Sequence, residues 1–242
     1  MGINNLHFRP QILPTVMVML LAPLFLGLGF WQLDRAEQKR AMAGTQEARR
    51  KLPPLRLEGS PVEASQVEYR RLIARGHFLA DKTILVENRK HRGRTGFHVI
   101  SPLRIFGGER YLLVNRGWTE TMAVAADPTL PASVDLVEVS GQAVVPAPPA
   151  LDLGAAAASR TNRWPFVTLD AYREWSGLDI YPFMLLQAPE GKAGFVRNWP
   201  QVTANDAMHI GYAIQWFAFA VIAFFIWLVL SLERAAPGVE QS

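Results

Sequence analysis

His209 is the residue of this sequence whose chemistry most needs an explanation. It stands directly before an apolar segment, Ile210 to Leu232, that contains no charged residue. A neutral imidazole is a common metal ligand, and a polar group at membrane depth is costly to bury and tends to face protein or a cavity. We therefore take His209 as the candidate metal ligand of this chain.

On a helix, with about 100° between successive residues, His209 shares one face with aromatic and small side chains. These are Tyr212, Ala213, Trp216, Ala220, Ala223 and Trp227. Small residues allow another helix or a flat ring to approach closely. One interpretation is that the imidazole is an axial ligand to haem iron, framed by Tyr212 and Trp216. The other is that it lies at the membrane interface and bonds to headgroups or backbone; the residues alone leave both open.

A second apolar segment, Ile12 to Leu33, is expected to end at the same membrane level as His209. Gln32 and Arg35 stand at that end. Either side chain could meet a polar substituent of a haem, and Arg35 could equally be an ordinary anchor whose charged head reaches the interface. Gly27 and Gly29 would let two helices approach closely, although helix packing without any cofactor would also explain them.

Each apolar segment is long enough to cross a bilayer, which takes about 20 residues. The first exceeds the roughly 7–15 apolar residues of a signal peptide, and the bulky, charged stretch Leu33 to Glu37 offers no cleavage site, so we expect an uncleaved anchor. Two transmembrane helices, residues 12–33 and 209–232, place both termini on one side. The basic residues that follow the first span favour a cytoplasmic middle region, but long loops cross largely regardless of charge. Orientation stays open on charge alone.

The middle region, residues 34–208, is predicted to be one α+β domain. Residues 34–51 should extend the first span as a helix that Pro53 and Pro54 end. Strand patterns and turn residues then alternate, which is typical of an antiparallel sheet or small barrel. The predicted strands are 69–78, 83–87, 97–103, 111–115, 134–145 and 179–187, with a short capped helix at 168–175 and a Pro/Ala-rich loop at 146–158.

No enzymatic constellation is visible, and we predict that the protein is not an enzyme. The absence of cysteine excludes disulfides, thiolate nucleophiles and cysteine-ligated metals. Serine-hydrolase, zinc-protease and phosphate-binding loop motifs are also missing. His77 and His98 fall in predicted strands, where we interpret them as surface or satisfied core histidines, and Gly93 and Gly96 as residues of a hairpin turn.

The hairpin from Arg89 to Arg94 is densely basic. It could contact an anion such as a lipid phosphate, a propionate or an acidic partner, or it could be a solvated turn kept soluble by its charge. Nucleic acid is not an expected partner for a domain tied to a membrane at both ends.

Several segments, in order along the whole chain, resemble the Surfeit locus protein 1 family. They are Phe30–Arg35 with Lys39, Glu68–Arg70, Gly76 with Phe78, Val86–Arg89, Gly96–Leu103, Leu113–Trp118 and His209–Phe217. No such match extends from Val124 to Arg163.

The resemblance implies a non-enzymatic assembly factor for haem–copper terminal oxidases. Such a protein binds haem a, with His209 as axial ligand to the iron and with Tyr212, Trp216, Gln32 and Arg35 around it. It promotes haem insertion into oxidase subunit I, and its further expected partners are membrane lipids and haem a synthase.

The family topology implies a bacterial inner-membrane protein with cytoplasmic termini, residues 1–11 and 233–242, and a periplasmic domain. The alternative function is a periplasmic scaffold that stabilises oxidase subunits without haem.

Overall fold

The computed structural model describes residues 6–120, 136–147, 162–189, 194–199 and 206–234. The chain divides into two compact units. The helical unit comprises Met1–Gly44 and Val202–Ser242, and the β-rich unit comprises Thr45–Gln201. The first is therefore built from both ends of the chain, and the second from the middle.

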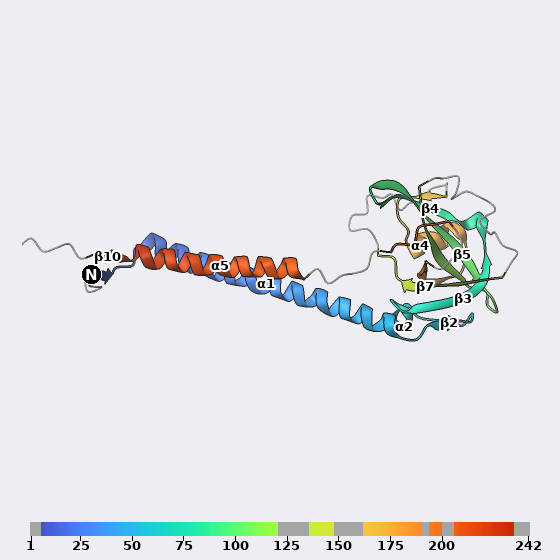
Figure 1. The fold of residues 1–242 in the computed structure, drawn as a ribbon, viewed down its shortest axis with the longest axis horizontal. Coiled ribbons are helices and arrows are strands. Elements are labelled where there is room, and N and C mark those ends of the chain that lie inside the picture. The colour runs from blue at the N-terminus through green and yellow to red at the C-terminus, as the bar shows by residue number, and fades with distance from the viewer. Residues whose placement is uncertain (1–5, 121–135, 148–161, 190–193, 200–205, 235–242) are drawn as a thin grey trace, which may run out of the picture. The chain divides into compact units, whose positions relative to one another are not determined.

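Two helices dominate the helical unit, α1 (Ile12–Lys51) and α5 (Ala207–Leu230), which lie side by side (Figure 1). Both are long and apolar enough to cross a membrane. Beyond their outer ends, β1 (Leu6–Phe8) pairs antiparallel with β10 (Leu232–Arg234). This small two-stranded sheet was not predicted.

Close contact between the helices depends on one glycine of α1. A Cβ atom at Gly29 would lie 2.5 Å from the ring of Phe217, so only a residue without a side chain admits that ring. Among the described residues nothing lies within 4 Å of the corresponding position at Gly27, which therefore plays no part in the approach. The prediction for Gly29 is confirmed, and the one for Gly27 is wrong.

Helix α1 continues past its apolar part to Lys51, as expected for residues 34–51, and ends two residues before Pro53. A proline disfavours helical backbone in the residue before it, which explains the stop. The last turns of α1 belong to the β-rich unit. There Arg49 Nη1 donates to the carbonyl of Ser65 at 2.7 Å.

The β-rich unit is an eight-stranded mixed sheet that closes into a small barrel. The strands lie in the order β2-β3-β7-β9-β6-β5-β4-β8, and β3 also pairs with β5. Because β3 bonds to both β7 and β5, five strands form a closed ring. Most pairs are antiparallel, while β2–β3, β4–β8 and β6–β9 are parallel. The predicted α+β class with a mainly antiparallel barrel is confirmed.

The elements of this unit, in chain order, are β2 (Leu55–Leu57), α2 (Ala64–Val67), β3 (Arg71–Phe78), η1 (Ala80–Lys82), β4 (Ile84–His91), β5 (Arg94–Ile105), β6 (Tyr111–Thr119), β7 (Val137–Val144), β8 (Arg163–Trp164), α4 (Leu169–Ser176) and β9 (Ile180–Gln187). The predicted strands correspond to β3, β4, β5, β6, β7 and β9, and the capped helix to α4. Val134 and most of the predicted loop 146–158 lie outside the described residues.

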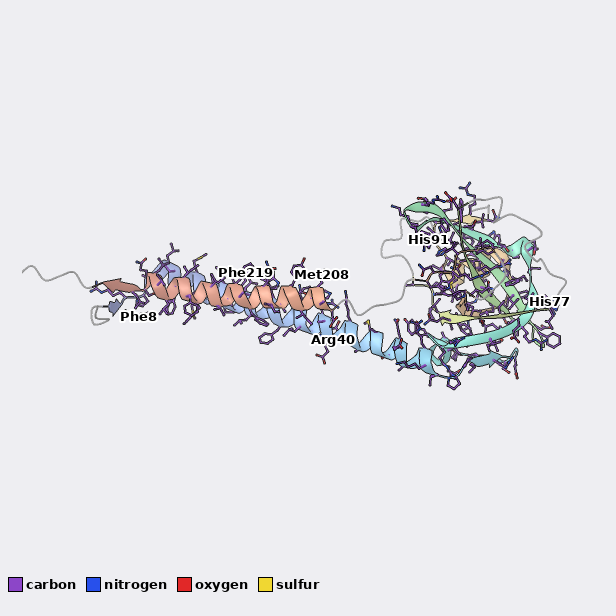
Figure 2. The ribbon with its side chains drawn as sticks, in the orientation of Figure 1. Phe8, Arg40, His77, His91, Met208 and Phe219 are labelled. Atoms are coloured by element: carbon purple, nitrogen blue, oxygen red, sulfur yellow. The ribbon has the colours of Figure 1, made fainter. Side chains whose placement is uncertain are left out.

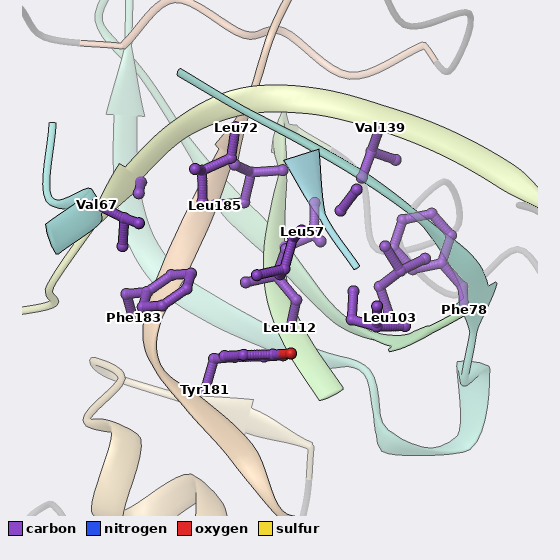
Figure 3. Packing of buried hydrophobic residues seen from close by; sticks show 14 residues of the cluster. Leu57, Val67, Leu72, Phe78, Leu103, Leu112, Val139, Tyr181, Phe183 and Leu185 are labelled. Carbon is purple, nitrogen blue, oxygen red and sulfur yellow. The ribbon is translucent and has the colours of Figure 1, made fainter. Parts of the chain in front are cut away.

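Alternating side chains of the ring of strands fill the barrel. In β3 the buried residues recur at every second position, which turns Leu72, Ala74 and Phe78 inward. All three belong to one cluster, and Figure 3 shows Leu72 and Phe78 in it together with Leu103 and Leu185 from other strands. A second apolar cluster contains Trp164 and Tyr172 and is covered by α4. This core fixes the positions of the strands that carry the polar site described below.

Candidate functional site

His209 and Gln32 meet in the helical unit, as their predicted common level suggested. His209 lies in the first turn of α5, and its Nδ1 atom is 2.7 Å from Oε1 of Gln32 on α1. An amide oxygen can only accept a hydrogen bond, so Nδ1 carries the hydrogen and donates it. The neutral ring therefore has its lone pair on Nε2.

The Nε2 atom is buried and has no hydrogen-bond partner among the residues that the structure describes. Leaving a buried acceptor unsatisfied costs about 1–3 kcal/mol. A lone pair held this way, with the other ring nitrogen bonded to an oxygen acceptor, is the usual arrangement of a histidine that ligates a metal. The residues present therefore fit one axial imidazole bond to haem iron. The iron would reach Nε2 only after the side chains that cover this atom move.

The other predicted site residues lie in different surroundings. Trp216 stacks on Phe25 of α1, with ring centroids 5.8 Å apart and planes inclined by 26°, so its ring is part of the helix packing. Tyr212 is half exposed. Arg35 is exposed and donates to Gln38 Oε1 at 3.0 Å, with its guanidinium over the ring of Trp31. The structure thus brings Gln32 to His209 and gives Arg35 other partners.

The N-terminus of α5 carries an ion pair that the sequence did not predict. Asp206, the N-cap residue, pairs with Arg40 on α1. Figure 2 shows Arg40 at the level of Met208, two residues after Asp206. Both partners remain partly exposed, so the pair adds little to the stability of the two helices.

A second polar site lies in the β-rich unit, around His98 of β5. Asn115 of β6 places its Nδ2 atom 3.3 Å from His98 Nδ1, and its Oδ1 atom accepts from the backbone N–H of Gly117 at 3.3 Å. An NH₂ group only donates, so His98 Nδ1 accepts and Nε2 carries the hydrogen. Burial, and then the charge of Arg89, lowers the pKa of His98 to about 4. The ring is therefore neutral near pH 7.

His98 lines a pocket of about 410 Å³ beside the β4–β5 hairpin. His91, labelled in Figure 2, belongs to the same wall. Two indole rings complete it, and both have their N–H groups engaged. Trp118 Nε1 donates to the carbonyl of Arg89 at 2.7 Å, and Trp199 Nε1 to the carbonyl of Gln187 at 2.8 Å. These bonds hold the rings in fixed positions.

Two glycines near this pocket allow neighbouring groups to pack closely against the backbone. A Cβ atom at Gly96 would lie 2.2 Å from the carbonyl oxygen of Thr119 and 2.8 Å from the ring of Trp118. At Gly117, where φ is 130°, it would lie 2.6 Å from Cβ of Phe195. The interpretation of Gly96 as a turn residue is wrong, because it lies inside β5. Gly93, with a φ of 80°, does form the turn.

Comparison with known proteins gives one family. The model of the SURF1 family matches residues 19–221. The chain belongs to the SURF1 family. The resemblance drawn from the sequence segments is therefore confirmed, and the matched residues include Gln32, His209 and the whole His98 pocket.

Individual SURF1 relatives are distant. Surfeit locus protein 1 of Rattus norvegicus is 26% identical over 88% of this chain and 74% of its own length. A SURF1-like protein of Monosiga brevicollis is 33% identical over 38% of this chain and 39% of its length. The cytochrome oxidase assembly protein SHY1 of Saccharomyces cerevisiae is 34% identical over 41% of this chain. The chain thus matches 26% of the yeast protein and well under half of the Monosiga protein.

Three residues of the SURF1 chain have roles that the sequence did not reveal. Asn115 fixes the tautomer of His98, Trp199 forms part of the pocket wall, and Asp206 pairs with Arg40. Asn115 and His98 lie within segments that carried the family resemblance, and these segments correspond to β6 and β5. Their place in those segments could have marked them as candidate site residues. Nothing in the sequence linked Trp199 to either of them.

Proposed function

We propose that this protein is a non-catalytic assembly factor for a haem–copper oxidase that binds haem a through His209 and promotes its insertion into oxidase subunit I. Membership of the SURF1 family and the name of the yeast relative, cytochrome oxidase assembly protein SHY1, support a role in cytochrome oxidase assembly. The single observation that supports haem binding is the Nε2 atom of His209, which is buried and has no hydrogen-bond partner in the described part of the chain. The two apolar helices support a location in a membrane. Bacterial inner membrane, cytoplasmic termini and a periplasmic β-rich unit belong to the same proposal.

The roles of the two bonded residues follow from their geometry. Gln32 accepts the Nδ1 hydrogen of His209, which keeps the ring in the tautomer that has a free lone pair at Nε2. Haem, when bound, supplies an iron with an axial position that an imidazole can occupy. A single protein ligand suits a carrier because release then requires only one bond to break. Subunit I is the proposed recipient, and haem a synthase and membrane lipids are the further proposed partners.

The test compares haem content among purified variants from cells that make haem a. We expect His209→Ala to lose the bound haem and its Soret absorption. Gln32→Ala should weaken retention, and Gln32→Glu, which keeps an oxygen acceptor, should restore it. Gln38→Ala is the matched control, since Gln38 lies on the same helix but bonds to Asp34 and Arg35. Identical haem content and spectra in wild type and His209→Ala would end the axial-ligand proposal.

A scaffold without haem is the second candidate function, and the exposed basic hairpin favours it. Arg92 is exposed at a φ of 46°, and Arg94 pairs with Glu120 at 2.9 Å. If the protein acts as a scaffold, charge reversal at Arg92 and Arg94 should reduce the amount of assembled oxidase, while His209→Ala should leave it unchanged. Blue-native electrophoresis of the membranes separates the two functions.

A further inference from the structure

The His98 pocket takes no part in the function proposed above. Its volume of about 410 Å³ falls within the range of about 300–1,000 Å³ that small-molecule sites occupy. It is built by β4, β5, β6 and the segment 194–199, all within the β-rich unit. The segments Val86–Arg89, Gly96–Leu103 and Leu113–Trp118 meet at this one place.

The polar groups of the pocket include hydrogen-bond donors and cations. His98 has its Nδ1 atom engaged by Asn115, which leaves the Nε2–H group for the pocket. Lys90 brings an exposed ammonium group, and Asn88 and Asn198 bring carboxamides. No lining residue among those described is acidic. An anion therefore matches the pocket in both charge and hydrogen bonding.

Carboxylates close to the pocket in sequence are already paired within the protein. Glu87 pairs with Arg163, and Glu120 pairs with Arg94. Among the described residues neither Arg89 nor Lys90 forms an ion pair. Arg89 instead donates from Nη2 to the carbonyl of Pro165 at 3.0 Å, and burial lowers its pKa. The pocket is thus lined by two cationic side chains that have no ion-pair partner among the described residues, and Lys90 is the more exposed of the two.

The remaining walls are aromatic. Because the N–H groups of Trp118 and Trp199 bond to backbone carbonyls, these rings offer carbon surface to a ligand. The ring of Trp199 also stands edge-on to that of His98, with centroids 5.5 Å apart and planes inclined by 77°. Fixed aromatic surfaces favour a flat apolar group.

We propose that this pocket binds a small organic monoanion in which a carboxylate is attached to a flat apolar ring. The carboxylate accepts from His98 Nε2–H and pairs with Lys90, and the ring packs against Trp118 and Trp199. Inorganic phosphate carries no apolar group that could pack against these two indole rings. The site is separate from His209 and does not depend on haem.

Calorimetric titration of the full-length protein in detergent, corrected with empty micelles, tests this site. The probes are indole-3-acetate, its neutral amide indole-3-acetamide, and inorganic phosphate. We expect indole-3-acetate to bind with one-to-one stoichiometry and the amide at least about ten-fold more weakly, since a charge-assisted hydrogen bond is lost. Phosphate should bind more weakly than indole-3-acetate.

Matched variants locate the binding. Lys90→Gln and His98→Phe should each weaken indole-3-acetate by about ten-fold. Arg92→Gln removes the same charge from the same hairpin but does not line the pocket, and it should bind as wild type does. The proposal is overturned if no probe binds, if acid and amide bind equally, if phosphate binds more tightly than the acid, or if Lys90→Gln and Arg92→Gln weaken binding to the same extent.

Discussion

The two units of this protein each hold a partly buried histidine whose Nδ1 atom meets a carboxamide, but the carboxamides present opposite ends. Gln32 offers its oxygen to His209, whereas Asn115 offers its NH₂ group to His98. The first contact leaves a lone pair on Nε2, and the second leaves an N–H group there. The same two functional groups, an imidazole and a carboxamide, thus leave an acceptor at one ring and a donor at the other.

The most severe test of that difference replaces each of the two histidines by alanine in turn and measures haem binding. We expect His209→Ala to abolish haem binding and His98→Ala to retain it fully, because only His209 has a free lone pair at Nε2. The measurement is the haem-to-protein ratio from the pyridine haemochrome spectrum. Equal loss in the two variants would show that the amide orientation does not distinguish the rings.

The next-largest expected effect concerns the stability of the β-rich unit. Gly117→Ala should lower its free energy of unfolding by about 3 kcal/mol, because the added methyl group meets Phe195 and the backbone has a positive φ. Gly194→Ala is the control, since nothing described lies within 4 Å of its Cβ position. Urea denaturation of the full chain, followed by tryptophan fluorescence, compares them. A Gly117→Ala protein as stable as the control would contradict the close approach.

A pH titration tests the lowered pKa of His98. Because its pKa is about 4 in the folded protein and about 6.5 in an unfolded chain, the unfolded state takes up a proton first as the pH falls. The free energy of unfolding should therefore decrease between pH 6.5 and pH 4, by up to about 3 kcal/mol. NMR titration of the ring measures the pKa directly.

Asn115→Asp should reverse the contact at His98. A carboxylate accepts a hydrogen from Nδ1, so the lone pair moves to Nε2 and the pKa rises. The pH dependence of stability between pH 6.5 and pH 4 should then become shallower. An unchanged pKa in Asn115→Asp would mean that burial alone sets it.

The smallest expected effects come from single hydroxyl groups in the two units. Thr15→Val removes the acceptor of the Trp227 Nε1–H bond of 2.9 Å between the helices, which should cost about 0.6 kcal/mol. Thr168→Ala removes the N-cap of α4, where Oγ1 accepts from Ala171, and should cost about 1 kcal/mol. Thermal unfolding of the two variants compares these losses of stability. A larger loss in Thr15→Val than in Thr168→Ala would contradict the expected order.

Much of the fold was predictable because it depends on local pattern. The two uncharged apolar runs mark α1 and α5, and alternation along Arg71–Phe78 marks the inward face of β3. The short strands β2 and β8 were missed, since 3 and 2 residues carry no periodicity. Gly96 was misjudged because it follows Gly93 closely in a glycine-rich stretch, whereas its role comes from Trp118 on the neighbouring strand.

The residues of the helical site were predictable from the sequence, but the direction of the hydrogen bond between them was not. Gln32 and His209 stand at the ends of two apolar runs, so hydropathy alone placed them at one level. Which end of the carboxamide faces the imidazole is a matter of side-chain rotation, and hydropathy carries no information on it. The His98 pocket needed tertiary pairing, since β6 pairs with β5 and the segment near Trp199 is joined to β6 by the Trp118–Val196 bridge.

The helical unit takes its two helices from opposite ends of the chain, and this sets an order of events during synthesis. Chain elongation delivers α1 and the entire β-rich unit before α5 exists, and domains generally fold as units while the chain grows. The contact between Gln32 and His209 therefore cannot form until nearly all residues have been joined. A chain truncated between Gln201 and α5 would contain the whole β-rich unit and never form the His209 contact.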